Sequence, residues 1–140
     1  MGCRVRVRIK CGSRVVETSA LVNSGFETDA PDIIVPLELA KKLGLWPPRE
    51  LSYTVLETGG GEVSAVYLES VAELELVLLD REPRKCLVNV IINPHVHEVV
   101  LSDYVSAHLG IVLLNIKKGL WKLEDDPIGL IREPEKPEEW

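Results

Sequence analysis

Apolar and polar residues alternate with a period of two at the start of the chain. Over residues 3–11, the odd positions are cysteine, valine or isoleucine and the even positions are arginine or lysine. This alternation predicts a half-buried β-strand whose apolar face, cysteines included, points inward. Gly12-Ser13 predicts a turn, and residues 14–22 predict a second strand paired with the first. Asn23-Ser24-Gly25 then interrupts the pattern.

Two short helices are predicted by their start and stop residues. Pro36 stands at a first helical position after the apolar residues 33–35, and Gly44 ends that helix two turns later. Ser102 is a suitable N-cap for a helix that runs to His108. Further strands are predicted over residues 51–56, 63–68, 71–79, 86–92, 111–116 and 120–123. We therefore expect a mainly β fold with two short helices.

The length of 140 residues suits one hydrophobic core. We expect a single domain over residues 1–124 and an acidic tail over residues 125–140, whose prolines favour an extended or mobile segment. The start of the chain is basic and its end is acidic. The favoured interpretation is two solvated faces. The alternative is attraction between the two ends, within one chain or between chains.

Composition excludes several classes of function. The net charge of −6 argues against nucleic acid as the main partner. No apolar run approaches the ~20 residues of a membrane-spanning helix. The first residues lack the apolar core of a signal peptide, so we expect a cytoplasmic protein without membrane contact. Three cysteines without paired spacing argue against a disulfide framework and a zinc knuckle. Glutamine is absent while Glu, Lys and Arg are plentiful, a bias reported for thermophile proteins.

Several pieces of sequence occur in an order that is typical of one protein family. An apolar pair leads into Asn23-Ser24-Gly25, and a strand, a proline and a helix ending in Leu43-Gly44 follow. A hairpin with the tip Gly59-Gly60-Gly61 comes next, and Val99-Val100-Leu101-Ser102 leads into the second helix. This order resembles the retropepsin-like aspartic proteases over roughly residues 3–124. Alone, the Asn-Ser-Gly tripeptide is typical of an ordinary turn, and the order of elements favours the family.

The resemblance implies a retropepsin-like acid-protease barrel that forms a homodimer and acts on a peptide or a protein, with no cofactor. Each chain of that family contributes one aspartate, and the two aspartates share a proton. One activates water while the other polarises the scissile carbonyl. The implied catalytic-loop positions are Asn23, Ser24 and Gly25. The implied positions in the flap over the substrate are Thr58, Gly59, Gly60 and Gly61.

Position 23 departs from this family, which has aspartate there. An amide neither takes nor gives a proton near neutral pH, so we expect no peptide hydrolysis by the chain as given. Asn23 is an engineered replacement of aspartate, a natural residue of a binding module, or a residue that deamidates slowly to aspartate, which is the weakest of the three accounts. Ser102 is a second departure, since the family usually has glycine there. The alternative function is a non-catalytic peptide-binding or dimerisation module on the same fold.

Other polar residues are weaker candidates for chemistry. Asp29 and Asp32 follow the loop closely as substitute carboxylates, but we expect them to face solvent or to cap residue 33 onward. His95 and His97 would share one face of a strand and, with Glu98 or His108, could hold a metal. No fourth ligand has convincing spacing. Exposed loop histidines are therefore the favoured interpretation, and we expect no metal.

Overall fold

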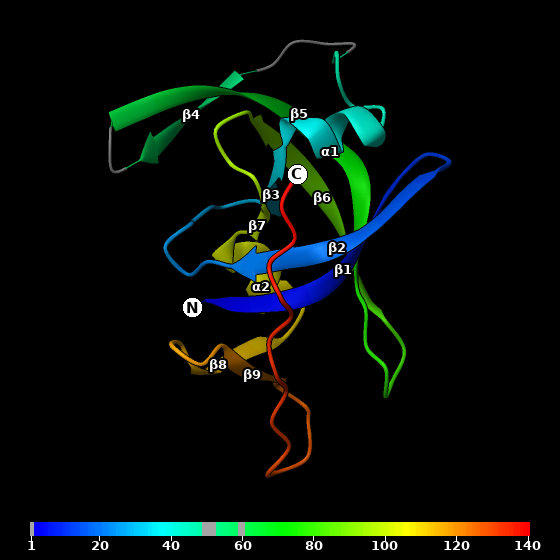
Figure 1. Ribbon diagram of the computed structural model, residues 1–140, viewed down its shortest axis with the longest axis vertical. Coiled ribbons are helices and arrows are strands. Elements are labelled where there is room, and N and C mark those ends of the chain that lie inside the picture. The colour runs from blue at the N-terminus through cyan, green and yellow to red at the C-terminus, as the bar shows by residue number, and fades with distance from the viewer. Residues whose placement is uncertain (1, 49–52, 59–60) are drawn as a thin grey trace.

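The computed structural model describes residues 2–48, 53–58 and 61–140, and it is mainly β, with a closed barrel of six strands and two short helices (Figure 1). The barrel strands, in spatial order, are β1 (Cys3–Cys11), β2 (Arg14–Val22), β7 (Val99–Leu101), β3 (Asp32–Pro36), β6 (Arg84–Asn93) and β5 (Gly61–Leu76). The other elements are β4 (Tyr53–Thr58), which pairs with β5, the helices α1 (Leu37–Lys42) and α2 (Asp103–His108), and a hairpin of β8 (Ile111–Asn115) and β9 (Leu120–Leu123). The predicted mainly β fold with two short helices is confirmed.

Strand β1 closes the barrel because it has a neighbour on each side. It pairs with β2 along its whole length and with the end of β5, both antiparallel. Its predicted alternation is confirmed, since Val5, Val7 and Ile9 have no solvent exposure and the intervening basic residues are only partly buried. Burying each such aliphatic side chain contributes about 1.5–3 kcal/mol. Strand β1 therefore contributes one complete face to the core of the barrel.

Strand β3 lies between two partners and is buried on both faces. It pairs parallel with β6 and antiparallel with β7, and all of its residues are buried. Ile33 and Val35 belong to the main core inside the barrel, whereas Ile34 belongs to a second, smaller apolar cluster. This two-sided burial is the reason why the strand reads as a continuous apolar run instead of an alternating one.

Strand β5 is one long strand where the sequence pattern predicts two, over residues 63–68 and 71–79. Its register with β6 shifts after Leu68. At this irregularity Ser70 has a φ of 48° and donates its backbone N–H to Oδ1 of Asn89 at 2.8 Å. A β-bulge of this kind absorbs extra residues without ending the strand. Residues 69 and 70, which separate the two predicted strands, are therefore accommodated within β5.

Both helices begin close to the predicted residues. Ser102 is the N-cap of α2, where its Oγ accepts a hydrogen bond from the N–H of Val105 at 3.2 Å. Pro36 is the N-cap of α1 instead of its first helical residue, because it also ends β3. Gly110 follows α2 with a φ of 78°, a conformation that favours glycine. In the described residues, neither helix has the length and apolar character needed to cross a membrane.

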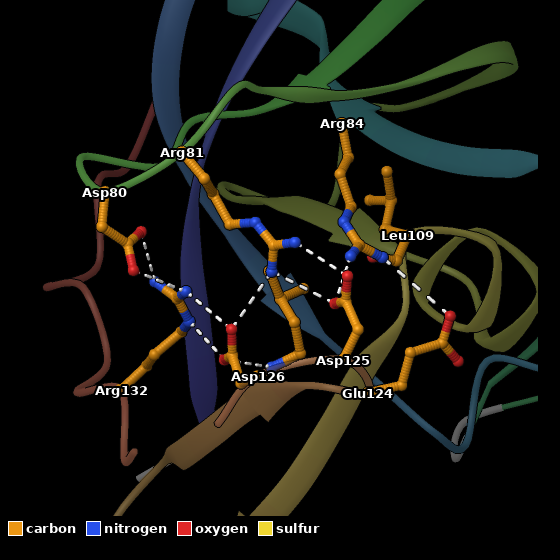
Figure 2. A network of polar contacts seen from close by, with 9 residues as sticks. Asp80, Arg81, Arg84, Leu109, Glu124, Asp125, Asp126 and Arg132 are labelled. Atoms are coloured by element: carbon orange, nitrogen blue, oxygen red, sulfur yellow. Dashed lines mark hydrogen bonds and ion pairs between the residues drawn. The ribbon is translucent and has the colours of Figure 1, made fainter. Parts of the chain in front are cut away.

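The segment after β9 is anchored by a network of guanidinium and carboxylate groups (Figure 2). Arg132 lies between Asp126 and Asp80, with its Nε 2.8 Å from Oδ2 of Asp126 and its Nη2 3.0 Å from Oδ2 of Asp80. Arg81 contacts both Asp125, at 2.7 Å, and Asp126, at 3.2 Å. The Arg132 guanidinium lowers the pKa of Asp126 to about 2. This network holds the start of the tail against the turn between β5 and β6.

The remainder of the tail is extended, as predicted, but it is docked on the barrel. The N–H of Glu135 donates to the carbonyl of Arg4 at 2.8 Å. Arg6 forms ion pairs with Glu135, at 3.6 Å, and with Glu138. The basic start and the acidic end of the chain therefore attract each other within one chain. The favoured expectation of two solvated faces was wrong, because it treated as independent two segments that the closed barrel brings side by side.

Candidate functional site

The loop that follows β2 lies beside the start of α2. Strand β2 pairs parallel with β7, with Val22 opposite Leu101, so the residues that follow these two strands emerge at the same edge of the sheet. The N–H of Asn23 approaches the carbonyl of Leu101 at 3.4 Å. The structure thus brings Asn23 next to the Leu101-Ser102 segment, although these residues are far apart in the sequence.

The Asn23-Ser24-Gly25 turn is exposed and is held by the side chain of Asn23. Oδ1 of Asn23 accepts a hydrogen bond from the N–H of Gly25 at 3.0 Å, and the carbonyl of Asn23 accepts one from the N–H of Phe26 at 3.1 Å. A Cβ at position 25 would lie 3.2 Å from the same Oδ1, so glycine leaves that oxygen free of steric pressure. An aspartate oxygen can accept the same N–H. The turn therefore suits aspartate as well as asparagine.

The N-terminus of α2 braces this loop from behind. Ser102 is fully buried, and its N–H donates to the carbonyl of Asp32 at 3.3 Å. The N–H of Asp103 donates to the carbonyl of Phe26 at 2.9 Å, and Oδ1 of Asp103 accepts the N–H of Thr28 at 3.0 Å. Both ends of the loop are thereby tied to one rigid element. Serine at position 102 fits because its hydroxyl caps the helix.

Asp32 is a buried carboxylate, whereas from the sequence we expected it to face solvent or to cap residue 33 onward. Its exposed fraction is 7%. Oδ1 of Asp32 accepts hydrogen bonds from the hydroxyl of Tyr67 at 2.8 Å and from Nδ2 of Asn89 at 2.9 Å. Burial and the neighbouring Asp32 raise the pKa of Tyr67 to about 12. The expectation was wrong because the partners of Asp32 come from β5 and β6, whereas Asp29 is exposed as expected.

A second apolar cluster lies next to the loop, separate from the main core. Strands β3, β5, β6 and β7 contribute one buried residue each to it, and Phe26 of the loop packs against them. The buried members are Ile34, Ala65, Ile91 and Val100, with Phe26, Tyr67 and Val96 at the margin. Sequence reasoning missed this cluster. The signal was the lack of alternation in residues 33–35, which implies burial on both faces.

The hairpin of β4 and β5 lies on the same side of the molecule as the Asn23 loop in the view of Figure 1, beyond the body of the barrel. Thr58 pairs with Gly61 next to the tip. Gly59 and Gly60, which the resemblance assigns to the flap, lie outside the described residues. Of the flap positions, the structure therefore describes only the backbone pairing of Thr58 with Gly61.

The histidine segment does not form the arrangement that a strand would give. Residues 94–98 form a turn and loop, so His95 and His97 do not share a strand face. Glu98 is engaged by Arg4, with Oε1 2.7 Å from Nε and Oε2 3.0 Å from Nη2. His97 instead contacts the carbonyl of Trp140 through Nδ1 at 3.3 Å. These contacts tie the segment to β1 and to the tail.

A cleft of about 710 Å³ lies away from Asn23. It is lined by the turn after β1, the end of α1 and the middle of β5, including Cys11, Leu45 and Val71. Asn23 directly follows β2, whereas the turn after β1 directly precedes β2, so the two lie at opposite ends of this strand. Burial raises the pKa of Cys11 to about 11, so its thiol stays protonated and unreactive. The cleft therefore has an apolar wall and no reactive thiolate.

No family model and no curated protein matches the chain.

Proposed function

We propose that the protein is a homodimeric scaffold of the aspartic-peptidase type, similar to retropepsins, and that it does not hydrolyse peptides while Asn23 occupies the catalytic position. The observation that carries this proposal is the Asn23 turn itself. Its side-chain oxygen accepts the Gly25 N–H, and the loop is tied to β7 and α2. A carboxylate introduced at position 23 would enter a turn that is already formed, without rearranging the backbone.

The chemistry follows from having one such loop in each chain. Two copies are needed to bring two residue-23 side chains together. Two carboxylates held side by side share one proton. One of them then activates water while the other polarises the peptide carbonyl. Two asparagines cannot replace them, because neither amide accepts or releases a proton near neutral pH. The native chain is thus expected to bind without cutting.

The second candidate is a non-catalytic peptide-binding or dimerisation module on the same fold. The apolar cluster around Ile34 and Val100 is buried, but Phe26, Tyr67 and Val96 at its margin are only partly buried and can contact an apolar side chain beside the loop. In the described residues, β4 pairs with β5 along one of its edges. An extended peptide can add to the other edge through main-chain hydrogen bonds. This candidate keeps the binding step and omits the chemistry.

The deciding experiment compares three chains: the native protein, Asn23→Asp, and Asn23→Ala as the matched control. Each is incubated with a mixed peptide library from acidic to neutral pH, with and without an aspartic-protease inhibitor. We expect inhibitor-sensitive, acid-favoured cleavage by Asn23→Asp alone, because the shared proton must be present. Absence of cleavage by a folded, dimeric Asn23→Asp protein favours the binding module. Cleavage by the Asn23 protein itself requires deamidation or a different mechanism, and intact mass tells which.

The homodimer is tested separately by light scattering at micromolar concentration. We expect twice the chain mass of 15.6 kDa. A monomer at this concentration would contradict a shared site in both candidates. Arg4, Arg6 and Arg8 are engaged by glutamates of their own chain. Residues 127–131 include the fully exposed Ile128. The apolar residues of that segment are therefore the better place for interface substitutions.

A further inference from the structure

The tail beyond Arg132 forms a strap, residues 133–140, across the outside of the barrel. Figure 1 shows it passing over β1 and β2 toward α1. Its N–H groups donate to three different elements: Glu135 to the carbonyl of Arg4 at 2.8 Å, Glu138 to Oγ of Ser19 at 2.9 Å, and Trp140 to the carbonyl of His97 at 2.8 Å. The strap is thus bound as an extended peptide, through its main chain.

Trp140, at the aromatic end of the strap, is partly buried against the main core and also makes polar contacts. Nε1 of Trp140 donates to Oγ1 of Thr18 at 3.1 Å. The Nζ of Lys42 lies 5.0 Å from the centroid of the tryptophan ring, within the range of a cation–π interaction. Thr18 and Ser19, which bind the strap, have no solvent exposure. Trp140 therefore combines apolar contact with the core, a hydrogen bond to the Thr18 hydroxyl and the Lys42 cation beside its ring, while the Ser19 hydroxyl binds the main chain of Glu138.

The acidic residues of the strap match the basic face of β1. Arg6 pairs with Glu135 and Glu138, and the Arg6 guanidinium lowers the pKa of Glu138. Pro134 and Pro137 favour the extended backbone that the strap needs to reach from β1 to α1. The surface thus recognises three features together: an extended backbone, carboxylates opposite Arg6, and an aromatic residue beside Thr18 and Lys42.

The strap is held by polar contacts and by the packing of Trp140 against the main core. Its ion pairs are partly exposed, with 28% of the Arg6 side chain and 40% of the Glu138 side chain accessible to solvent. Solvent screens such pairs, so each one contributes little to holding the strap in place. The start of the tail behaves differently, because Arg132 is fixed by Asp126 and Asp80 (Figure 2). Release can therefore begin after Arg132 and leave the rest of the fold in place.

We propose that the strap surface is a binding site for an acidic, proline-containing segment with an aromatic end on a partner protein, and that the chain's own residues 133–140 occupy this site as a displaceable self-ligand. The tethered strap competes at a high effective concentration, so a partner segment must bind with higher affinity than the strap in order to displace it. This inference does not depend on the chemistry at position 23.

The test uses full-length chains and a labelled synthetic peptide with the sequence of residues 132–140. Its binding is followed by fluorescence anisotropy. In the released variant, Glu138→Ala with Trp140→Ala, the competing strap loses the side-chain contacts of Glu138 and Trp140 and keeps the Glu135–Arg6 pair. We expect the peptide to bind this variant with a dissociation constant about tenfold lower than for the native chain. Adding Arg6→Gln to the released variant should weaken binding again by about tenfold, because the carboxylates lose their partner.

Matched controls separate recognition from general charge. Glu139 is exposed, so Glu139→Ala in the chain should leave peptide binding at the native level. A peptide with Trp140→Ala should bind the released variant much more weakly. If the released variant does not fold, Trp140→Phe, which removes the indole N–H and keeps an aromatic ring, replaces it.

Three outcomes overturn the proposal. One is equal affinity for native and released chains, and another is no binding to a folded released variant at millimolar peptide. The third is a native dimer that becomes a monomer in the released variant, because the occupant would then be the tail of a second copy. Thermal unfolding of every variant establishes that the compared chains are folded.

Discussion

Asp126 allows the strength of the tail anchor to be measured. Its carboxylate is 1% exposed and accepts hydrogen bonds from Nε of Arg132 and from the N–H of Leu123, both at 2.8 Å. These bonds, with the Arg132 guanidinium first among the causes, lower the pKa of Asp126 from the ordinary 3.8 to about 2. At about 1.4 kcal/mol per pH unit, this difference corresponds to about 2 kcal/mol of folding stability at neutral pH.

We predict that Asp126→Asn lowers the free energy of unfolding by about 2 kcal/mol at pH 7, or the melting temperature by about 6 °C for a chain of this size. The pKa of Asp126 is lower in the folded state than in the unfolded state. Its contribution is therefore complete above about pH 4 and is lost as the pH falls toward about 2. Urea unfolding of both proteins at pH 7 and at about pH 3 measures this convergence.

Asp125 supplies the matched control, since it is the adjacent residue and carries the same charge. Its side chain is 51% exposed, although it pairs with Arg81 and Arg84. Solvent screens such pairs, so Asp125→Asn should cost less than about 1 kcal/mol. Equal losses for the two substitutions would refute the reasoning. A loss for Asp126→Asn that stays the same at acidic pH would refute it as well.

Two further predictions concern buried polar groups and thiols. Tyr67→Phe should cost about 1–2 kcal/mol in urea unfolding, because Asp32 loses a buried hydrogen bond. Tyr104→Phe, at a 44% exposed site, should be neutral, and comparable losses for both would count against a special role of the Asp32 contact. The buried Cys3, Cys11 and Cys86 should react with a thiol reagent at pH 8 only after unfolding, since burial raises the pKa of each thiol. A thiol that reacts rapidly in the folded protein would contradict this.

The sequence by itself determined those elements whose signals are local. The alternation over residues 3–11 predicted β1, and the cap at Ser102 predicted the start of α2. Such signals depend on neighbours a few residues away, because a strand repeats every two residues and a cap acts within one helical turn. The turn at Asn23 could also be predicted, since its Oδ1 bonds a backbone N–H two residues on. The bulge at Ser70 could not, because its partner Asn89 lies on another strand.

Only the tertiary structure decided which distant segments meet. The pairing of β2 with β7 sets Asn23 beside Leu101, and the closed barrel sets Asp32 beside Tyr67 and Asn89. The polar character of the tail suggested solvation, yet its residues dock on β1 and β2. A charge pattern carries no information about which partner the fold brings within reach. Partner choice depends on the closure of the whole sheet, which buries the strands together and so fixes every contact between them.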